Sequence, residues 1–163
     1  MQAIIECRGW RIMRRRSTSG TLFTIGYEGL SPGDLVKTLR HNGVELVLDV
    51  RQRASSRKAG FSKSVLKSNL EKHGISYQHF PELGSPPDLR KKYNADGDRA
   101  YFIRHYRNSL EGKGSILQEL ANLASTMPVA LVCYEADPGH CHRSIVASEM
   151  ARLSTPALQV QDL

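Results

Sequence analysis

Short apolar runs alternate with amphipathic segments along residues 21–163 of this 163-residue chain. The first run is Leu22–Ile25, and a later one, Val44–Val50, has the unbroken apolar character of a central parallel strand. Between them, Ser31-Pro32-Gly33-Asp34 is typical of a helix start, with serine at the N-cap and proline at the first position. Repetition of strand and helix predicts a parallel sheet with helices on both faces.

The rest of the chain continues this pattern. The expected elements are a helix over 62–74, a strand over 75–80, helices over 101–110 and 115–124, a strand over 129–133, a helix over 141–153 and a strand over 157–160. Residues 84–98 are polar and carry turn residues, which indicates a loop. We therefore predict a single three-layer α/β domain over residues 21–163, with a mostly parallel sheet of about five strands.

Residues 1–20 have a different composition from the rest of the chain. They contain five arginines and one glutamate, and so contribute +4 of the net charge of +7. We predict a basic, disordered N-terminal extension outside the domain. A nucleic-acid-binding arm is one alternative, and translation from Met13 is another.

The expected cellular setting is the cytoplasm. No apolar run approaches the ~20 residues that span a bilayer, so we expect no membrane association. The N-terminal apolar run precedes the basic cluster, which is the reverse of a signal peptide. Three cysteines without a scaffold pattern favour free thiols in a reducing compartment.

The richest segment for chemistry is Val129–Arg143, with the sequence VALVCYEADPGHCHR. It predicts a buried strand, an acidic strand end at Glu135, a Pro-Gly turn and a helix that begins with Cys141-His142-Arg143. Free backbone N–H groups and a positive dipole at a helix start favour a thiolate and attract anions. The segment therefore indicates a functional site.

Polar side chains also follow the other predicted strands. Glu28 follows the first strand, Asp49 and Arg51 end the second, and His79 and Glu82 follow the third. Carboxyl ends of parallel strands share one edge, where open α/β sheets place ligands. We therefore expect Glu28, Asp49, Glu135 and Arg143 to converge on one cleft. The alternative for Asp49 and Glu135 is capping of nearby N–H groups or pairing with arginines.

Two basic stretches indicate an anionic ligand. Residues 51–67 carry six Lys and Arg residues and no acid, so they could hold a phosphate or a nucleic-acid backbone, with Arg57 as one clamp. Residues 90–107 interleave six cations with three tyrosines, which can stack bases. The alternative in both stretches is a solvated helix face.

Several motifs together resemble the domain-of-unknown-function family 488 (DUF488). They are TIGYEG at 24–29, LDVR at 48–51, SRKAGFSKSVL at 56–66, GISYQHFPELG at 74–84 and CYEADPGHCHRS at 133–144. The resemblance implies a compact α/β domain over about residues 21–163 and no established activity. The positions that it marks are Glu28, Asp49, Arg51, Arg57, Phe61, His79, Glu82, Glu135, Cys141, His142 and Arg143.

Three chemistries compete for these residues. Phosphoryl or nucleotide chemistry would use carboxylates as a general base or as ligands of a divalent metal such as Mg²⁺. Thiol chemistry would use Cys141 as a nucleophile beside a histidine. A transition-metal site would use Cys133, His140, Cys141 and His142, but neighbouring helical residues point about 100° apart.

The leading hypothesis is a domain that binds a phosphate-containing ligand, either a nucleotide or nucleic acid, and that catalyses a hydrolysis or transfer reaction on this ligand. The expected catalytic residues are Glu28, Asp49, Glu135, Cys141 and His142, and the expected ligand-binding residues are Arg51, Arg57, His79, Glu82 and Arg143. The alternatives are a non-catalytic nucleic-acid or regulatory ligand-binding module and a thiol-dependent enzyme. An enzyme needs a carboxylate near the bound phosphate, whereas a binding module needs only the cations.

Overall fold

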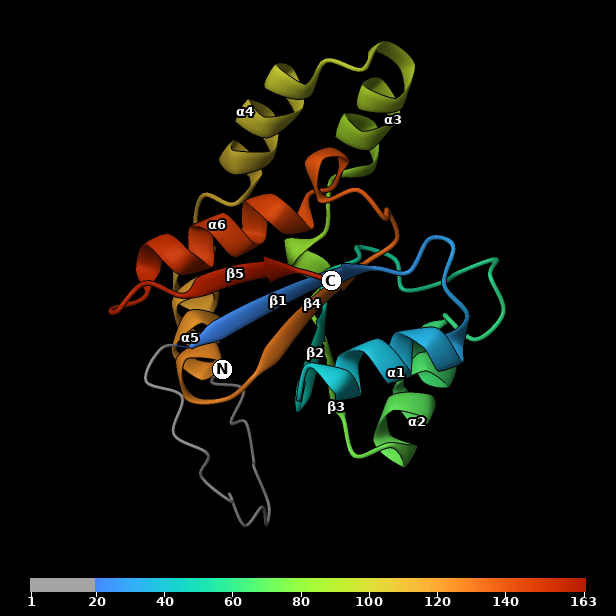
Figure 1. The fold of residues 1–163 in the computed structure, drawn as a ribbon. Helices are drawn as coiled ribbons and strands as arrows, with labels where there is room; N and C mark the ends of the chain where they lie inside the picture. Colours follow the sequence, from blue (N-terminus) through green and yellow to red (C-terminus); the bar gives the residue numbers. More distant parts are fainter. Residues whose placement is uncertain (1–19) are drawn as a thin grey trace.

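Five strands form one parallel sheet in the computed structural model, which describes residues 20–163 (Figure 1). The strands are β1 (Thr21–Gly26), β2 (Leu46–Asp49), β3 (Ser76–His79), β4 (Val129–Cys133) and β5 (Gln159–Asp162). Their order across the sheet is β3-β2-β4-β1-β5, and each neighbouring pair is parallel. The predicted fold class is confirmed. The predicted N-terminal extension lies outside the described residues, apart from Gly20.

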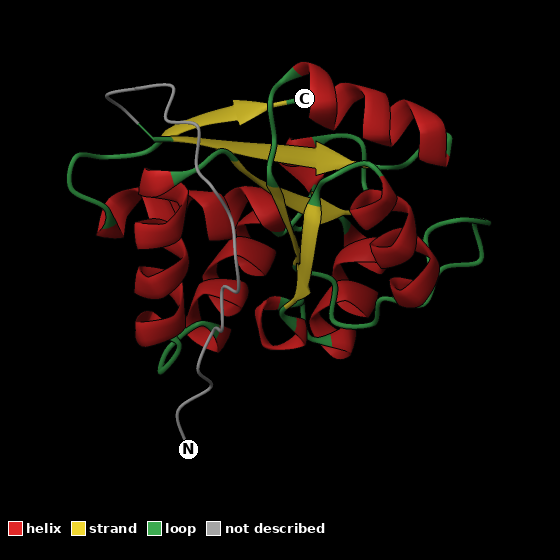
Figure 2. Cartoon of the chain, turned by 90° about the horizontal axis from the view of Figure 1, so that it is seen from below, coloured by secondary structure: helices red, strands yellow, loops and turns green. Residues whose placement is uncertain are grey.

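Helices cover both faces of this sheet (Figure 2). On one face, α1 (Pro32–His41) and α2 (Lys63–Lys72) bury leucines against β1, β2 and β4. On the other face, α5 (Gly114–Thr126) and α6 (Arg143–Leu153) enclose a second apolar core. The N-cap of α1 is Ser31, whose hydroxyl accepts from the Asp34 backbone N–H, as the sequence predicts. The sheet therefore has a separate core on each side.

A helical hairpin projects beyond the sheet (Figure 1). It consists of α3 (Pro87–Asp96) and α4 (Arg99–Ser109). The expectation of a loop over 84–98 is wrong, because Pro87 begins a helix and Gly97 ends it in the left-handed conformation. No residue of α3 is fully buried, and its contact with the core is made by Leu89 and Tyr93, four residues apart and partly buried, in an otherwise polar sequence.

The strand register determines which residues meet at the carboxyl edge. Gly26 of β1 pairs with Cys133 of β4, and Asp49 of β2 pairs with Val132 of β4. The ends of β1, β2 and β4 are therefore adjacent, and the segments after them meet at one edge of the sheet. Within residues 20–163, no helix has the length and apolar character needed to cross a bilayer.

Candidate functional site

The polar residues at the carboxyl edge divide between the two faces of the sheet. In β2, Val47 packs with the core under α1 and α2, whereas Leu48 packs with the core under α6. Side chains alternate along a strand, so Asp49 points toward the α1–α2 face. By the same alternation, Cys133 of β4 points toward the α6 face, because Leu131 packs there. The expected convergence therefore fails for Asp49, whereas Glu28, Glu135 and Arg143 meet at the loop after β4.

On the α1–α2 face, Asp49 and Arg51 form a buried ion pair. The Arg51 Nε and Nη2 donate to the two Asp49 carboxylate oxygens at 2.8 and 2.5 Å, and both side chains are at most 5% exposed. Arg51 Nη1 also donates to the Tyr27 hydroxyl and the Phe61 carbonyl, both at 2.8 Å. The Tyr77 hydroxyl donates to Asp49 at 2.5 Å.

This ion pair is structural. Burial alone would lower the pKa of Arg51, but the Asp49 carboxylate outweighs it and raises that pKa. Burial, together with the Asp49 carboxylate, raises the pKa of the Tyr77 hydroxyl. Arg51 therefore stays charged, and all three nitrogens of its guanidinium donate to protein atoms. Neither side chain is accessible, so Asp49 is not placed for the expected catalytic role and Arg51 is not placed for the expected ligand binding.

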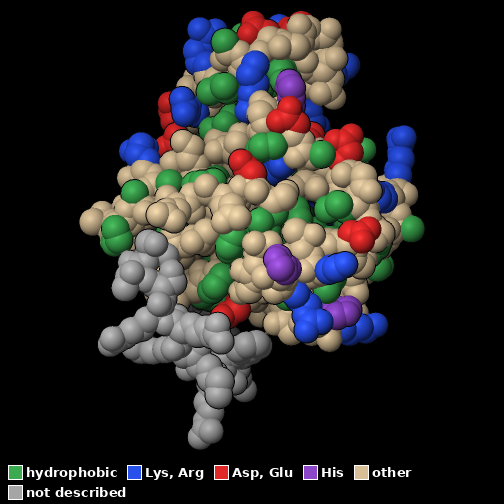
Figure 3. All heavy atoms as spheres, viewed as in Figure 1, with side chains coloured by type: hydrophobic (Ala, Val, Ile, Leu, Met, Phe, Trp, Pro, Cys, Tyr) green, Lys and Arg blue, Asp and Glu red, His purple; other side chains and the backbone are tan. Residues whose placement is uncertain are grey.

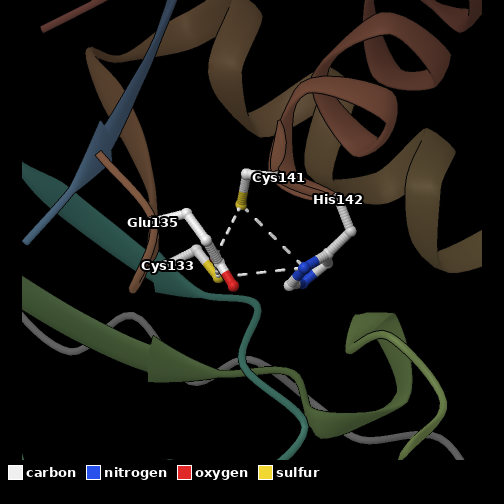
Figure 4. Close-up of side chains that lie close together, drawn as sticks. All are labelled: Cys133, Glu135, Cys141 and His142. Carbon is white, nitrogen blue, oxygen red and sulfur yellow. Dashed lines mark hydrogen bonds between the residues drawn. The ribbon is translucent and has the colours of Figure 1, made fainter. Parts of the chain in front are cut away.

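On the α6 face, four side chains form a compact group that we call the thiol cluster: Cys133, Glu135, Cys141 and His142 (Figure 4). The Cys133 and Cys141 sulfurs each lie 3.1 Å from Glu135 Oε2. They lie 3.8 and 4.0 Å from His142 Nδ1. The cysteines and the histidine are at most 5% exposed, and Glu135 is partly buried.

The electrostatics of this cluster keep Cys141 protonated. Burial, and then the neighbouring Cys133 thiol, raise the pKa of Cys141 above its ordinary value. Burial also opposes ionisation of Glu135, but hydrogen bonds that include the two thiols outweigh it and lower the pKa of Glu135. Similarly, burial alone would lower the pKa of His142, but Cys141 and the Val50 carbonyl raise it. The expected reactive thiolate is not supported, because Cys141 is buried and precedes the helix.

Helix α6 begins at Arg143, two residues later than predicted. Cys141 is extended, with φ −113° and ψ 149°, and His142 is the N-cap of the helix. The 100° separation expected between neighbouring helical residues does not apply, and both side chains reach the same cluster. His140 is instead exposed and bonds to Asp137. Glu135 takes the place predicted for His140.

Arg143 secures the loop between β4 and α6 and is fully buried. Its guanidinium donates to the backbone carbonyls of Glu135 and Ala136 and to the Thr24 hydroxyl. Gly26 permits this arrangement, because a Cβ there would lie 1.7 Å from the Glu135 carbonyl oxygen. The expected ligand-binding role of Arg143 is therefore replaced by a structural one.

The other predicted site residues lie around this edge without entering either group. Glu28 accepts from the Ala136 backbone N–H at 3.1 Å, and His79 Nε2 lies 2.8 Å from the Arg51 carbonyl. Arg57 is exposed in the loop before α2, and Glu82 is exposed on the turn after β3. None of these four side chains contacts the thiol cluster in the part of the chain that the structure describes.

A surface depression of about 670 Å³, which we call the basic hollow, lies where α2 begins. Its lining contains three cations, one histidine, three serines and no acid: Arg53, Lys63, Lys67, His79, Ser55, Ser62 and Ser64, with Gln52 and Ala54. Because Gln52 follows β2 and His79 ends β3, the hollow lies at the carboxyl edge of the sheet. Other Lys and Arg side chains gather over the α3–α4 hairpin (Figure 3).

A second hollow, of about 440 Å³, provides a comparison. It follows α1 toward His41 and is lined by Lys37, Arg40 and His73 among others. It is also basic, but it runs along α1 from Gly33 to His41 and includes the carboxyl-terminal turn, where the helix dipole is negative. The basic hollow instead contains the amino-terminal turn of α2, whose N-cap Ser62 makes no side-chain cap bond and whose first turn carries no acid.

Two features of this edge were not predicted from the sequence: the position of Glu135 beside both cysteines, and the serines that line the basic hollow. Cys133 and Glu135 are two residues apart at a strand end, so a turn that returns the chain can bring Cys141 beside both. The predicted Pro-Gly turn was the signal for that return, but the helix start expected at Cys141 obscured its consequence. The lining serines of the basic hollow carried no such signal, because serine is common in every loop.

Comparison with known proteins gives one match. The model of the family described as "Domain of unknown function DUF488" matches residues 31–150, which is most of the chain. No curated protein and no solved structure matches the chain. The family match covers β2, β3 and β4, the first turn of α2 and all four residues of the thiol cluster. The chain therefore belongs to the DUF488 family.

Proposed function

We propose that this domain binds a phosphate-bearing ligand, a nucleotide or nucleic acid, in the basic hollow. The observation that carries the proposal is the lining itself, in which Arg53, Lys63 and Lys67 lie together with no carboxylate among the lining residues. Glu71, which pairs with Lys67 at 3.7 Å, lies outside the lining. Hydroxyls and a helix start supply further hydrogen-bond donors for phosphate oxygens. The proposal replaces Arg51 and Arg143, which are committed to protein contacts, with cations that reach solvent.

The same lining favours binding over hydrolysis. A general base or a Mg²⁺ site for phosphoryl chemistry would need a carboxylate beside the phosphate. Asp49 is enclosed in its ion pair, and Glu135 is bonded to two thiols. We therefore favour a non-catalytic ligand-binding module, located in the reducing cytoplasm that free Cys133 and Cys141 suit.

Fluorescence anisotropy with labelled single-stranded DNA, single-stranded RNA and ATP tests this proposal. An Arg53→Ala/Lys63→Ala variant removes two charge-assisted contacts of about 1.5–3 kcal/mol each, so it should weaken binding about 100-fold or more. The matched control is Lys37→Ala/Arg40→Ala, which removes the same charge from the α1 hollow. This control should leave affinity nearly unchanged.

Salt dependence separates a polymer from a mononucleotide. Neutralisation of about three phosphates on a single strand should lower affinity about 20-fold between 50 and 200 mM salt, whereas ATP binding should fall less. Equal losses in the two double variants would indicate a diffuse charge effect and overturn the proposed site. Absence of binding to all three probes would overturn the function.

A further inference from the structure

The thiol cluster has the composition of a metal site. Two sulfurs, one imidazole nitrogen and one carboxylate oxygen lie within 4.8 Å of one another (Figure 4). We propose that Cys133, Glu135, Cys141 and His142 bind a single zinc ion, which joins the end of β4 to the start of α6. This inference does not depend on ligand binding in the basic hollow.

The spacing of the four donor atoms suits a tetrahedral ion. With Zn–S of about 2.3 Å and Zn–N of about 2.0–2.1 Å, neighbouring donors of a tetrahedron lie about 3.5–3.8 Å apart. Here the sulfur–oxygen distances are 3.1 Å, and the sulfur–nitrogen distances are 3.8 and 4.0 Å. These four distances differ from the tetrahedral values by about 0.5 Å or less, so small side-chain shifts would bring the donors to the spacing of a zinc site.

The imidazole already has the orientation of a metal ligand. His142 Nε2 lies 2.8 Å from the Val50 carbonyl oxygen, which can only accept a hydrogen bond. The proton of the neutral ring is therefore on Nε2, and the Nδ1 lone pair faces the two sulfurs. A backbone carbonyl that fixes the tautomer in this way is the usual partner of a metal-binding histidine.

The surroundings of the sulfurs also suit coordinated thiolates. The Arg143 backbone N–H donates to the Cys141 sulfur at 3.4 Å, at the amino end of α6. Such a bond and the helix dipole both stabilise negative charge on sulfur. Arg143 meanwhile clamps the backbone of Glu135 and Ala136, so the ligands are held in place. Binding of zinc to the two thiols releases their protons to solvent.

The ligand types select the metal. Thiolate and imidazole favour zinc over Mg²⁺ and Ca²⁺, which require oxygen ligands. Four protein ligands leave no open position for a substrate, and three of the four side chains are buried. Closed four-coordinate sites of this kind are structural. The ion would therefore stabilise the edge of the sheet and would not perform chemistry there.

Metal analysis and cobalt substitution of the full chain test the proposal. The purified protein should contain one zinc per chain, and Co²⁺ in its place should give the intense visible bands of a tetrahedral ion with sulfur-to-cobalt charge transfer. Zinc at 100-fold excess over its Kd should raise the thermal midpoint by about 5–10 °C, and a chelator should reverse this rise.

Matched variants identify the ligands. Cys141→Ser and His142→Gln should lose the bound metal, whereas His140→Gln, which alters an exposed neighbour, should retain it. If a variant fails to fold, the cobalt spectrum of the wild-type protein still decides the issue. An octahedral cobalt spectrum, a Cys133–Cys141 disulfide in freshly purified protein, or loss of metal in His140→Gln alone would overturn the proposal.

Discussion

Removal of the negative charge at Asp49 should destabilise the folded domain. The loss of unfolding free energy can be estimated from the buried ion pair. Asp49→Asn leaves the Arg51 guanidinium uncompensated at a position where both side chains are at most 5% exposed. Breaking such a pair costs about 3–5 kcal/mol. With a urea dependence of about 2 kcal/mol per molar, the unfolding midpoint should fall by about 1.5–2.5 M.

A double variant separates the charge effect from simple loss of contacts. Asp49→Leu/Arg51→Met removes both charges, and apolar replacement of a buried pair is often nearly neutral. Because Arg51 also donates a hydrogen bond to the Phe61 carbonyl, we expect the double variant to lose some stability, but less than Asp49→Leu alone. Urea unfolding of the single and double variants gives the coupling directly. An Asp49→Asn protein as stable as the wild type, or strictly additive single effects, would refute a structural ion pair.

Three further outcomes follow from the geometry. Gly26→Ala should displace the loop at Glu135 and lower the thermal midpoint sharply, because the new Cβ would meet that carbonyl, whereas Gly33→Ala, with no close neighbour, should not. Cys141 in the folded, metal-free protein should resist iodoacetamide at pH 8, and alkylation as fast as in urea would contradict its burial. Folding raises the pKa of Tyr77 above its unfolded value of about 10, so its contribution to stability is complete below pH 10 and is lost as the pH rises further. Urea unfolding from pH 8 to 11 should therefore show a steeper alkaline decline in the wild type than in Tyr77→Phe.

The fold was predictable because its signals are local. The apolar run of β4 and the Ser31 cap of α1 each specify an element without reference to the rest of the chain. Helix α3 was missed because its apolar stripe is short, with only Leu89 and Tyr93 partly buried against the core in an otherwise polar sequence. Sequence patterns therefore revealed elements with fully buried residues and failed on a helix that has none.

The site was only partly predictable, because its residues depend on strand parity. Strands β2 and β4 are buried on both faces, so their sequences do not alternate and do not tell which face Asp49 or Cys133 meets. A two-residue error in the start of α6 had a similar effect. It suggested that Cys141 and His142 diverge, whereas the extended Cys141 backbone brings both side chains together. The sequence thus located the edge correctly but could not assign its side chains to groups.

The order of strands also governs when the sheet can form during synthesis. Both neighbours of β1 come from the end of the chain, with Leu22 beside Val129 and Thr21 beside Gln159. Strand β4 also separates β1 from β2, so a nascent chain that ends after α4 can pair only β2 with β3. Contacts this distant along the chain slow folding and leave apolar strands unpaired. We therefore expect the sheet to close only once β4 and β5 have been synthesised, with β1 unpaired until β4 emerges.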